Sequence, residues 1–368
     1  MLEIKGNFNY AKVFTDSIDS GSEGLIKAFL NSEISENTVV RFMPDVHAGK
    51  GCCVGTTIKL NEKIVPGLIG TDIGCGVEAL KVKIKRLEFQ KLDKIIREKI
   101  PSGFNIRVKP HRYANLCDGL GDMHCAKHIN AEKTFLSLGT LGGGNHFIEI
   151  DKANDGYYLI IHSGSRHLGA EVEKFYHELA YSKTKDKVPY EFAYLEGDDA
   201  KHYLSDINVV KNYAHLNRMA IADEIIQGMK MDVDEENSIS CPHNYIDFET
   251  GILRKGAIEA QNGQKVIIPL NMRDGCLICE GFGNEDWNFS APHGAGRLYN
   301  RAESKSMFTL SQFKKEMKNV YSPSISHDTL DEAPMVYKNS DDIETFISPA
   351  VKILERIVPI YNFKAGTK

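Results

Sequence analysis

Six short irregular segments of the chain contain glycine or proline, and each carries an aspartate, a cysteine or a histidine. They are Pro44-Asp45-Val46-His47, Asp72-Ile73-Gly74-Cys75-Gly76, Gly142-Gly143-Gly144-Asn145-His146-Phe147-Ile148-Glu149, His162-Ser163-Gly164-Ser165-Arg166, Cys241-Pro242-His243-Asn244-Tyr245 and Ser290-Ala291-Pro292-His293-Gly294-Ala295-Gly296-Arg297. Glycine and proline interrupt regular elements, and glycine lets the backbone approach a ligand closely. A fold that uses these side chains together must bring several strand ends to one place.

The last segment surrounds His293 with residues that suit a phosphate group. Gly294 and Gly296 permit close backbone approach, and Arg297 supplies a planar, charged fork for phosphoryl oxygens. The imidazole between them can be a nucleophile or a metal ligand. A single motif of this kind also fits a surface turn, and it is the other segments that favour a functional site.

The residue types in the series suit a borderline transition metal. Aspartate, cysteine and histidine together bind Zn, Mn, Fe or Co, whereas Ca and Mg prefer a shell of oxygen atoms. Spacing leaves open whether these side chains meet. A histidine taken singly is more often a hydrogen-bonded core or surface residue.

Composition limits the class of protein. The chain has 368 residues, 42% hydrophobic and 26% charged, without an internal repeat or a low-complexity linker, so we expect one catalytic domain over residues 1–368. It lacks a long apolar run and a signal-peptide pattern, and we therefore expect a cytoplasmic protein with no membrane partner. A net charge of -5 argues against nonspecific coating of nucleic acid but permits a local basic groove.

The cysteines are spread thinly, and reduced thiols are expected. Cys276 and Cys279 have the spacing of a redox or zinc motif but lie in an apolar stretch that predicts a strand, where residues three apart face opposite sides. Both are interpreted as structural, as are the adjacent Cys52 and Cys53.

Periodicity predicts further elements. Helices are expected over 87–100, 170–180, 206–229 and 343–356, strands over 157–162, 265–269 and 276–280, and a turn over the acidic segment 232–238.

Several ordered motifs resemble the RtcB family of RNA-splicing ligases. They are PDVHAGKG, IGTDIGCGV, LGGGNHFIEI, HSGSRHLG, CPHNYIDFE, RKGA, SAPHGAGR and EAPMVYK, from about residue 40 to the C-terminus. The resemblance implies an α+β fold in which mixed β-sheets, flanked by helices, surround a dinuclear metal cleft. It also implies two Mn2+ ions, with Cys75 as a bridging thiolate, His146 and His162 completing one metal, and Asp72 and His243 the other.

The same resemblance implies a GTP-dependent ligase that joins RNA 2′,3′-cyclic phosphate or 3′-phosphate ends to 5′-hydroxyl ends, in tRNA splicing or RNA repair, and that can need an archease-type activator. His293 would carry the guanylyl group. The remaining implied contacts are Asn145 with a nucleotide or RNA phosphate, Glu149 with the guanine edge, Tyr337 with its face, Lys364 as the terminal lysine, and Arg166 and Arg297 with phosphates.

The chemistry of these residues agrees with the implied roles but leaves alternative functions open. A thiolate can partly neutralise two cations at once, and a histidine nucleophile needs a partner for its second N–H. Asp45 is interpreted either as a partner of a metal ligand or as a turn residue. A dinuclear phosphoesterase acting on RNA cyclic or terminal phosphates is the alternative enzyme, and a noncatalytic RNA-binding relative is a third interpretation.

The chain also departs from the family pattern. Residues 269–275 read Pro-Leu-Asn-Met-Arg-Asp-Gly where many relatives have Pro-Gly-Ser-Met-Gly, in a region that lines the family's nucleotide pocket. We expect Arg273 and Asp274 either to replace lost contacts or to reshape the site. The Leu298-Tyr299-Asn300-Arg301 segment and the FKAGTK terminus differ as well.

Overall fold

The computed structural model describes residues 1–365 and has an α+β fold of two large sheets and a small one. The first sheet has the strand order β1 (Leu2–Lys5), β2 (Tyr10–Val13), β3 (Val39–His47), β4 (Val54–Lys59), β10 (Ile252–Lys255) and β9 (Asn244–Ile246). The second has the order β12 (Lys265–Asn271), β13 (Gly275–Gly281), β15 (Val351–Lys364), β6 (Phe147–Ala153), β7 (Gly156–Ser163), β5 (Gly76–Lys83) and β8 (Asp232–Pro242). Strands β11 (Ala257–Glu259) and β14 (Ser290–Pro292) form the third. The pairing of β2 with β3 is parallel, and the second sheet is antiparallel, so the expectation of mixed sheets is confirmed.

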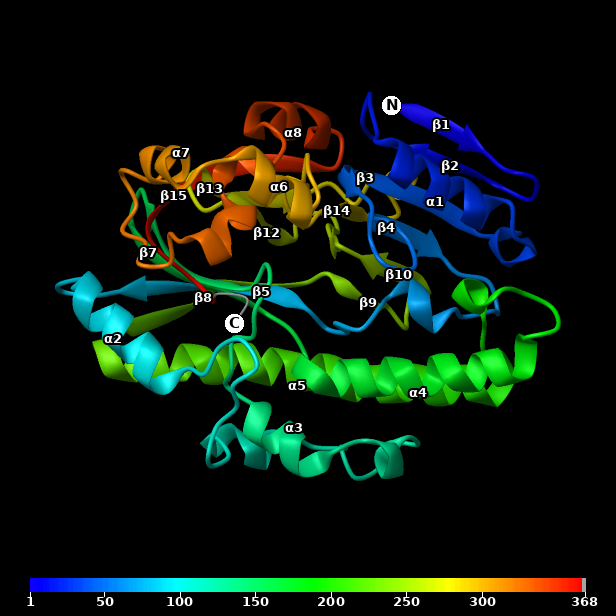
Figure 1. Cartoon of the computed structure of the whole chain (residues 1–368), viewed down its shortest axis with the longest axis horizontal. Coiled ribbons are helices and arrows are strands. Elements are labelled where there is room, and N and C mark those ends of the chain that lie inside the picture. The colour runs from blue at the N-terminus through cyan, green and yellow to red at the C-terminus, as the bar shows by residue number, and fades with distance from the viewer. Residues whose placement is uncertain (366–368) are drawn as a thin grey trace.

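Helices cover the sheets on both sides (Figure 1). The long helices α4 (Arg166–Thr184) and α5 (Gly197–Met229) run along one side, with α2 (Phe89–Lys99) near one end and α3 (Ala131–Ser137) beyond them. Helices α6 (Arg301–Met307), α7 (Leu310–Glu316) and α8 (Ser340–Ile347) lie on the other side, and α1 (Ser20–Leu30) packs beside the first sheet.

Two predicted elements are wrong. The segment 343–356 is not one helix, because α8 ends at Ile347 and β15 begins at Val351. Burial alternates along the first part of β15, which is the period of a strand, and Pro359 sits at a bulge where a helix would be broken. The acidic segment 232–238 is the start of β8, which tolerates exposed acids because it is an edge strand paired only with β5.

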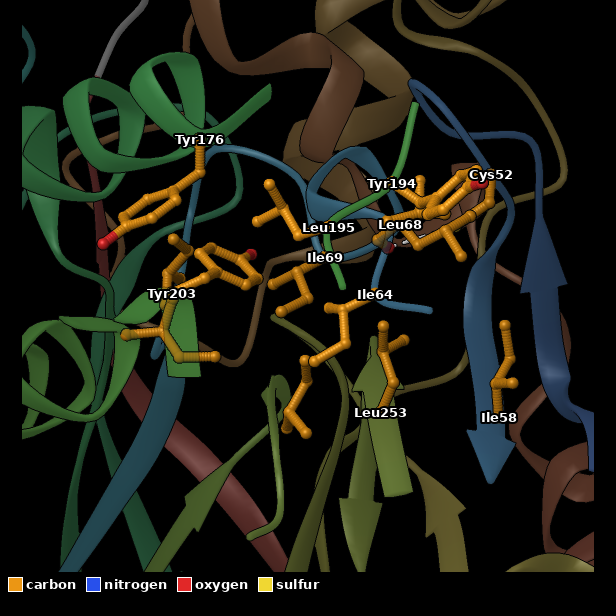
Figure 2. Close-up of a cluster of buried hydrophobic side chains, with 14 of the residues drawn as sticks. Cys52, Ile58, Ile64, Leu68, Ile69, Tyr176, Tyr194, Leu195, Tyr203 and Leu253 are labelled. Carbon is orange, nitrogen blue, oxygen red and sulfur yellow. Dashed lines mark hydrogen bonds between the residues drawn. The ribbon is translucent and has the colours of Figure 1, made fainter. Parts of the chain in front are cut away.

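Apolar side chains fill the space between the first sheet and helices α4 and α5. Figure 2 shows this core, in which Ile58 of β4 and Leu253 of β10 lie on one side and Tyr176 and Tyr203 come from the helices. Cys52 belongs to the same cluster, as its interpretation as a packing residue predicted. A second cluster packs β6 and β7 against α2 and α5.

The register of the second sheet determines where the irregular segments meet. Gly76 at the start of β5 lies opposite Ser163 at the end of β7 and Pro242 at the end of β8. Phe147 at the start of β6 lies opposite His162. Four adjacent antiparallel strands therefore begin or end at one edge, and the segments that flank them are brought together there.

Candidate metal and nucleotide site

Cys75 lies at the centre of the side chains gathered at this edge. Its Sγ is 3.5 Å from Nε2 of His146 and 3.3 Å from Nε2 of His162, and all three residues are buried. The cysteine precedes β5, one histidine precedes β6, and the other lies near the end of β7. The register of these strands brings the three residues to the same end of the sheet.

Two further predicted ligands flank this trio. Asp72 Oδ2 is 3.1 Å from Nε2 of His146, and His243 Nε2 is 3.3 Å from Nε2 of His162. The contacts therefore pair Asp72 with His146 and His243 with His162. The trio of Cys75, His146 and His162 is the set that the resemblance implies for one metal, and Asp72 and His243, implied for the other, lie beside it.

The second ring nitrogens of His146 and His162 are held as those of metal ligands usually are. His146 Nδ1 contacts the carbonyl oxygen of Leu141 at 2.9 Å, and His162 Nδ1 contacts that of Asn145 at 3.2 Å. Assigning the ring proton to Nδ1 in each case leaves an Nε2 lone pair directed at Cys75. The donor set thus fits a borderline transition metal.

Burial shapes the protonation of these ligands. It lowers the pKa of His162 and of His243 well below the usual range, and neighbouring imidazoles add to the effect. Burial and the charge of Asp72 raise the pKa of the Cys75 thiol well above its usual range. Without a cation the cysteine therefore keeps its proton, and metal binding would displace it.

Helix α5 holds three of the ligand-bearing segments together through two buried residues that the sequence did not single out. Asn217 accepts the backbone N–H groups of Gly139 and Thr140 and donates to the carbonyl oxygen of Gly164. Arg218 donates to the carbonyl oxygens of Gly74 and Ser163 at 2.9 and 3.0 Å. Neither residue carries a motif, and only the tertiary contacts identify them.

His293 lies next to the ligand cluster, with its ring centroid 4.8 Å from that of His243. Its Nδ1 is 2.7 Å from Oδ2 of Asp45, a fully buried residue of β3. Gly296 has a φ of 77°, and a Cβ atom there would clash with the carbonyl oxygen of Asp45. The glycine of this motif thus allows the His293 segment to pack directly on the segment that holds its partner.

A cavity of about 780 Å³ opens beside His293. Its lining includes the predicted site residues Asn145, Glu149, Arg297, Tyr337 and Lys364, together with the ligands His162 and His243. Glu149 lies on β6, and its carboxylate accepts a hydrogen bond from Nδ2 of Asn362. Burial raises the pKa of Glu149 to about 7.

Glu332 links four residues of the cavity wall, and the sequence did not single it out either. Its carboxylate accepts from Tyr337 Oη at 2.6 Å and Lys364 Nζ at 2.7 Å, and it pairs with Arg297 and Arg301. These cations hold the pKa of Glu332 well below its usual range despite burial. The one sequence feature that could have identified it is its position at the start of the EAPMVYK motif.

Arg166 does not line the cavity, although the other site residues predicted to bind phosphate do. It opens α4 with a left-handed φ of 59°, and its guanidinium lies against Gly142. Its charge also acts on the carboxylate of Asp72. Arg166 therefore belongs to the metal side of the site.

The departure at residues 269–275 forms the end of the β12–β13 hairpin. Pro269, Asn271 and Gly275 line the cavity, but Arg273 and Asp274 do not. Arg273 instead pairs with Asp274 at 2.7 Å and with Glu316 at 2.5 Å. These two residues thus stabilise the hairpin away from the cavity.

The remaining cysteines are free thiols in the described part of the chain. Cys276 and Cys279 lie on β13 as predicted, and both are fully buried. Among residues 1–365, no helix is long and apolar enough to cross a bilayer.

Comparison with known proteins finds one family across the chain. The family described as tRNA-splicing ligase RtcB matches residues 32–134 and 115–365. RNA-splicing ligase RtcB of Escherichia coli (strain K12) is 29% identical over 356 residues, covering 86% of this chain and 87% of the relative. The tRNA-splicing ligases RtcB of Nanoarchaeum equitans and Archaeoglobus fulgidus are 26% and 28% identical over 422 and 415 residues, covering 88% and 86% of this chain and 87% and 86% of the relatives.

Proposed function

We propose a function from one premise, that this chain belongs to the RtcB family of tRNA-splicing ligases. The protein is an RNA ligase. It joins RNA ends that carry a 2′,3′-cyclic phosphate or a 3′-phosphate to ends that carry a 5′-hydroxyl, with GTP as the activating nucleotide, in tRNA splicing or RNA repair. The observation that supports this most is the position of His293, held by Asp45 between the ligand cluster and the cavity.

The cleft would hold two Mn2+ ions. Cys75 would be shared, with His146 and His162 completing one metal and Asp72 and His243 the other; Cys75 contacts both members of the first pair, and the second pair lies beside them. When bound, the metals would supply positive charge to the phosphoryl oxygens of the reacting groups. The same donors suit Zn2+ and Co2+, so the choice of Mn2+ rests on the family resemblance.

His293 would carry the guanylyl group on Nε2. Because Nδ1–H donates to Asp45, Nε2 keeps its lone pair for attack on the α-phosphorus of GTP. An N–P bond forms, the bond from that phosphorus to the bridging oxygen breaks, and pyrophosphate leaves. The carboxylate of Asp45 balances the positive charge that develops on the ring.

Two further displacements would complete the reaction. An oxygen of the RNA 3′-phosphate attacks the guanylyl phosphorus and breaks the N–P bond, which leaves the RNA end joined to GMP. The 5′-hydroxyl oxygen then attacks the terminal RNA phosphorus, loses its proton and expels GMP. A 2′,3′-cyclic phosphate first takes up water to become a 3′-phosphate.

The cavity residues would recognise GTP. Glu149 would accept from the guanine edge, Tyr337 would lie against the base, and Lys364 would complete the nucleotide site. Asn145 and Arg297 would contact phosphates from the cavity wall, and Arg166 would hold a phosphate from the side of the metal ligands.

We also propose that residues 1–368 form one catalytic domain, because the site draws side chains from Asp45 to Lys364. RNA is the substrate in this proposal, an archease-type protein is an activator, and the cytoplasm is the compartment.

The deciding experiment separates the nucleophile from the metal ligands. Purified protein is incubated with Mn2+ and GTP labelled at the α-phosphate, and retention of label on the protein is measured. His293→Ala should take up no label, yet should seal an RNA already joined to GMP at its 3′-phosphate. Cys75→Ala should lose bound metal by elemental analysis and fail in both assays, whereas Cys279→Ala should behave as wild type.

Two results would contradict the proposal. Wild-type protein that opens cyclic phosphates but retains no label would be the dinuclear phosphoesterase. A His293→Ala variant that keeps its fold and both metals but cannot seal the activated RNA would give His293 a different role.

A further inference from the structure

A buried cluster lies behind the cavity wall at Glu149. Oxygen atoms of Glu149 and Asp151 and the Sγ atom of Cys276 all lie within 4.8 Å of one another. Glu149 is 2% exposed, and Asp151 and Cys276 are fully buried. The two acids are two residues apart on β6, so their side chains share one face of the sheet.

The two carboxyl groups have unequal partners. Glu149 accepts from Asn362 Nδ2, and the charge of Lys364 acts on it. Neither oxygen of Asp151 has a nitrogen or oxygen donor among residues 1–365, and its polar neighbours are Glu149 and the Cys276 thiol. Two ionised carboxylates this close and this buried would repel each other without compensation, so the pair must hold a proton.

Asp151 is the member that keeps the proton. Burial and the neighbouring Glu149 raise the pKa of Asp151 well above its usual range, whereas the hydrogen bond from Asn362 and the charge of Lys364 oppose the effect of burial on the pKa of Glu149. The asymmetry follows from the contacts, since Asn362 and Lys364 stabilise negative charge on Glu149 alone.

We propose that Asp151 is a positioning residue for nucleotide selection, whose neutral side chain donates a hydrogen bond to Glu149 and fixes that carboxylate toward the cavity. The inference rests on the proposed role of Glu149 as the acceptor for the guanine edge. An ionised carboxylate has about four acceptor positions. Asn362 and Asp151 occupy two of them, which leaves two for the N1–H and 2-amino groups of guanine. Adenine has neither donor at these positions and leaves the acceptors unpaired.

A proton explains the cluster more simply than a metal ion. Burial and the two acids raise the pKa of Cys276 well above its usual range, so the thiol stays neutral. One proton therefore removes the excess charge without any added group. A metal bound at Glu149, Asp151 and Cys276 is the competing explanation, and it makes a different prediction in the experiment.

The test compares Asp151→Asn with Asp151→Ala. Asparagine has the same shape and a permanent N–H donor, so it should keep the preference for GTP over ATP, measured as the ratio of equilibrium dissociation constants by calorimetry. Alanine lacks the donor. It should weaken GTP binding by about tenfold, as for the loss of one hydrogen bond to a charged group, and leave ATP binding unchanged. The guanylylation rate at saturating GTP should stay the same in all three proteins, since His293 is untouched.

An infrared measurement tests the proton directly. Wild type should show the carbonyl stretching band of a neutral carboxylic acid, and Asp151→Asn should lose it. Cys279→Ala, a buried thiol on the same strand but outside the cluster, is the matched control and should change neither the band nor the selectivity.

Three outcomes would overturn the proposal: unchanged GTP selectivity in Asp151→Ala, absence of the acid band, or a bound metal that is lost in Asp151→Asn. Failure of the proposed function would look different. In that case wild type would take up no label from GTP, while the infrared band would still report whether Asp151 is protonated.

Discussion

Asp45→Asn is the substitution that most directly tests the role of the buried partner of His293. The carboxylate accepts the Nδ1–H of His293 at 2.7 Å, and asparagine preserves its shape without its charge. A buried hydrogen bond to a charged group contributes about 1.5–3 kcal/mol. Since about 1.36 kcal/mol corresponds to a tenfold change in rate, guanylylation should slow by about 13-fold to about 160-fold. The larger loss applies if the new amide presents its NH2 group to Nδ1, because the ring proton then moves to Nε2 and blocks the nucleophile.

The assay is the single-turnover rate of label transfer from GTP at saturating nucleotide. Asp206→Asn is the matched control, because Asp206 is also buried and accepts three hydrogen bonds but does not line the cavity. It should lower the free energy of unfolding and leave the rate of the folded protein unchanged. Asp45→Asn should also seal RNA that already carries GMP at wild-type speed. A wild-type rate of guanylylation in Asp45→Asn would refute the view that this carboxylate prepares the nucleophile.

Five other substitutions give further tests. Gly296→Ala adds a Cβ at a left-handed φ of 77° and should abolish guanylylation. The Cβ of Gly294→Ala would meet its nearest atom at 3.2 Å, so this variant should lose less activity. Equal activities of the two variants would contradict the packing argument. Glu332→Gln leaves buried cations without their carboxylate and should lower the free energy of unfolding by about 3–5 kcal/mol in chemical denaturation. Tyr337→Phe, which removes the hydroxyl that donates to the Glu332 carboxylate, should lower the free energy of unfolding by about 1.5–3 kcal/mol in the same measurement. Burial lowers the pKa of His47 to about 4, so between about pH 6.5 and that value only the unfolded chain binds the proton. As the pH is lowered through this window, the free energy of unfolding should fall by up to about 1.36 kcal/mol per pH unit. His47 should contribute no further change above or below the window. His47→Gln should remove this part of the pH dependence.

The sequence predicted which residues form the metal cluster but not the contacts that bring them together. Residue types identified Asp72, Cys75 and the histidines as metal ligands, and the structure brings them into contact. The pairing within the cluster depends on the register of β5, β7 and β8, which local sequence does not encode. The long helices were predicted because their 3.6-residue period is local, whereas β15 was missed because its alternation is weak and its partners lie far away in sequence.

Partners of the site residues were the hardest part to predict. A histidine nucleophile requires an acceptor for its second N–H, but nothing in the sequence connects His293 with Asp45, which lies 248 residues earlier. Glu332 is similar, since its place in the EAPMVYK motif marks the segment but does not show that three cations and a hydroxyl surround its carboxylate. Such contacts follow from how the sheets are placed, and only the folded chain shows them.

Strand β6 shows how one short element serves both halves of the site. Its even-numbered residues Ile148 and Ile150 pack into the core formed with α2 and α5, so the odd-numbered positions face the other side. Glu149 and Asp151 therefore lie on the cavity side, while His146 stands just before the strand, at the edge where the metal ligands gather. The three-residue step from His146 to Glu149 does not have to place both on one face, because the histidine belongs to the preceding loop. A substitution that shifted the register of β6 by one residue would turn Ile148 and Ile150 toward the cavity. It would displace the metal ligand His146 and the nucleotide acceptor Glu149 together.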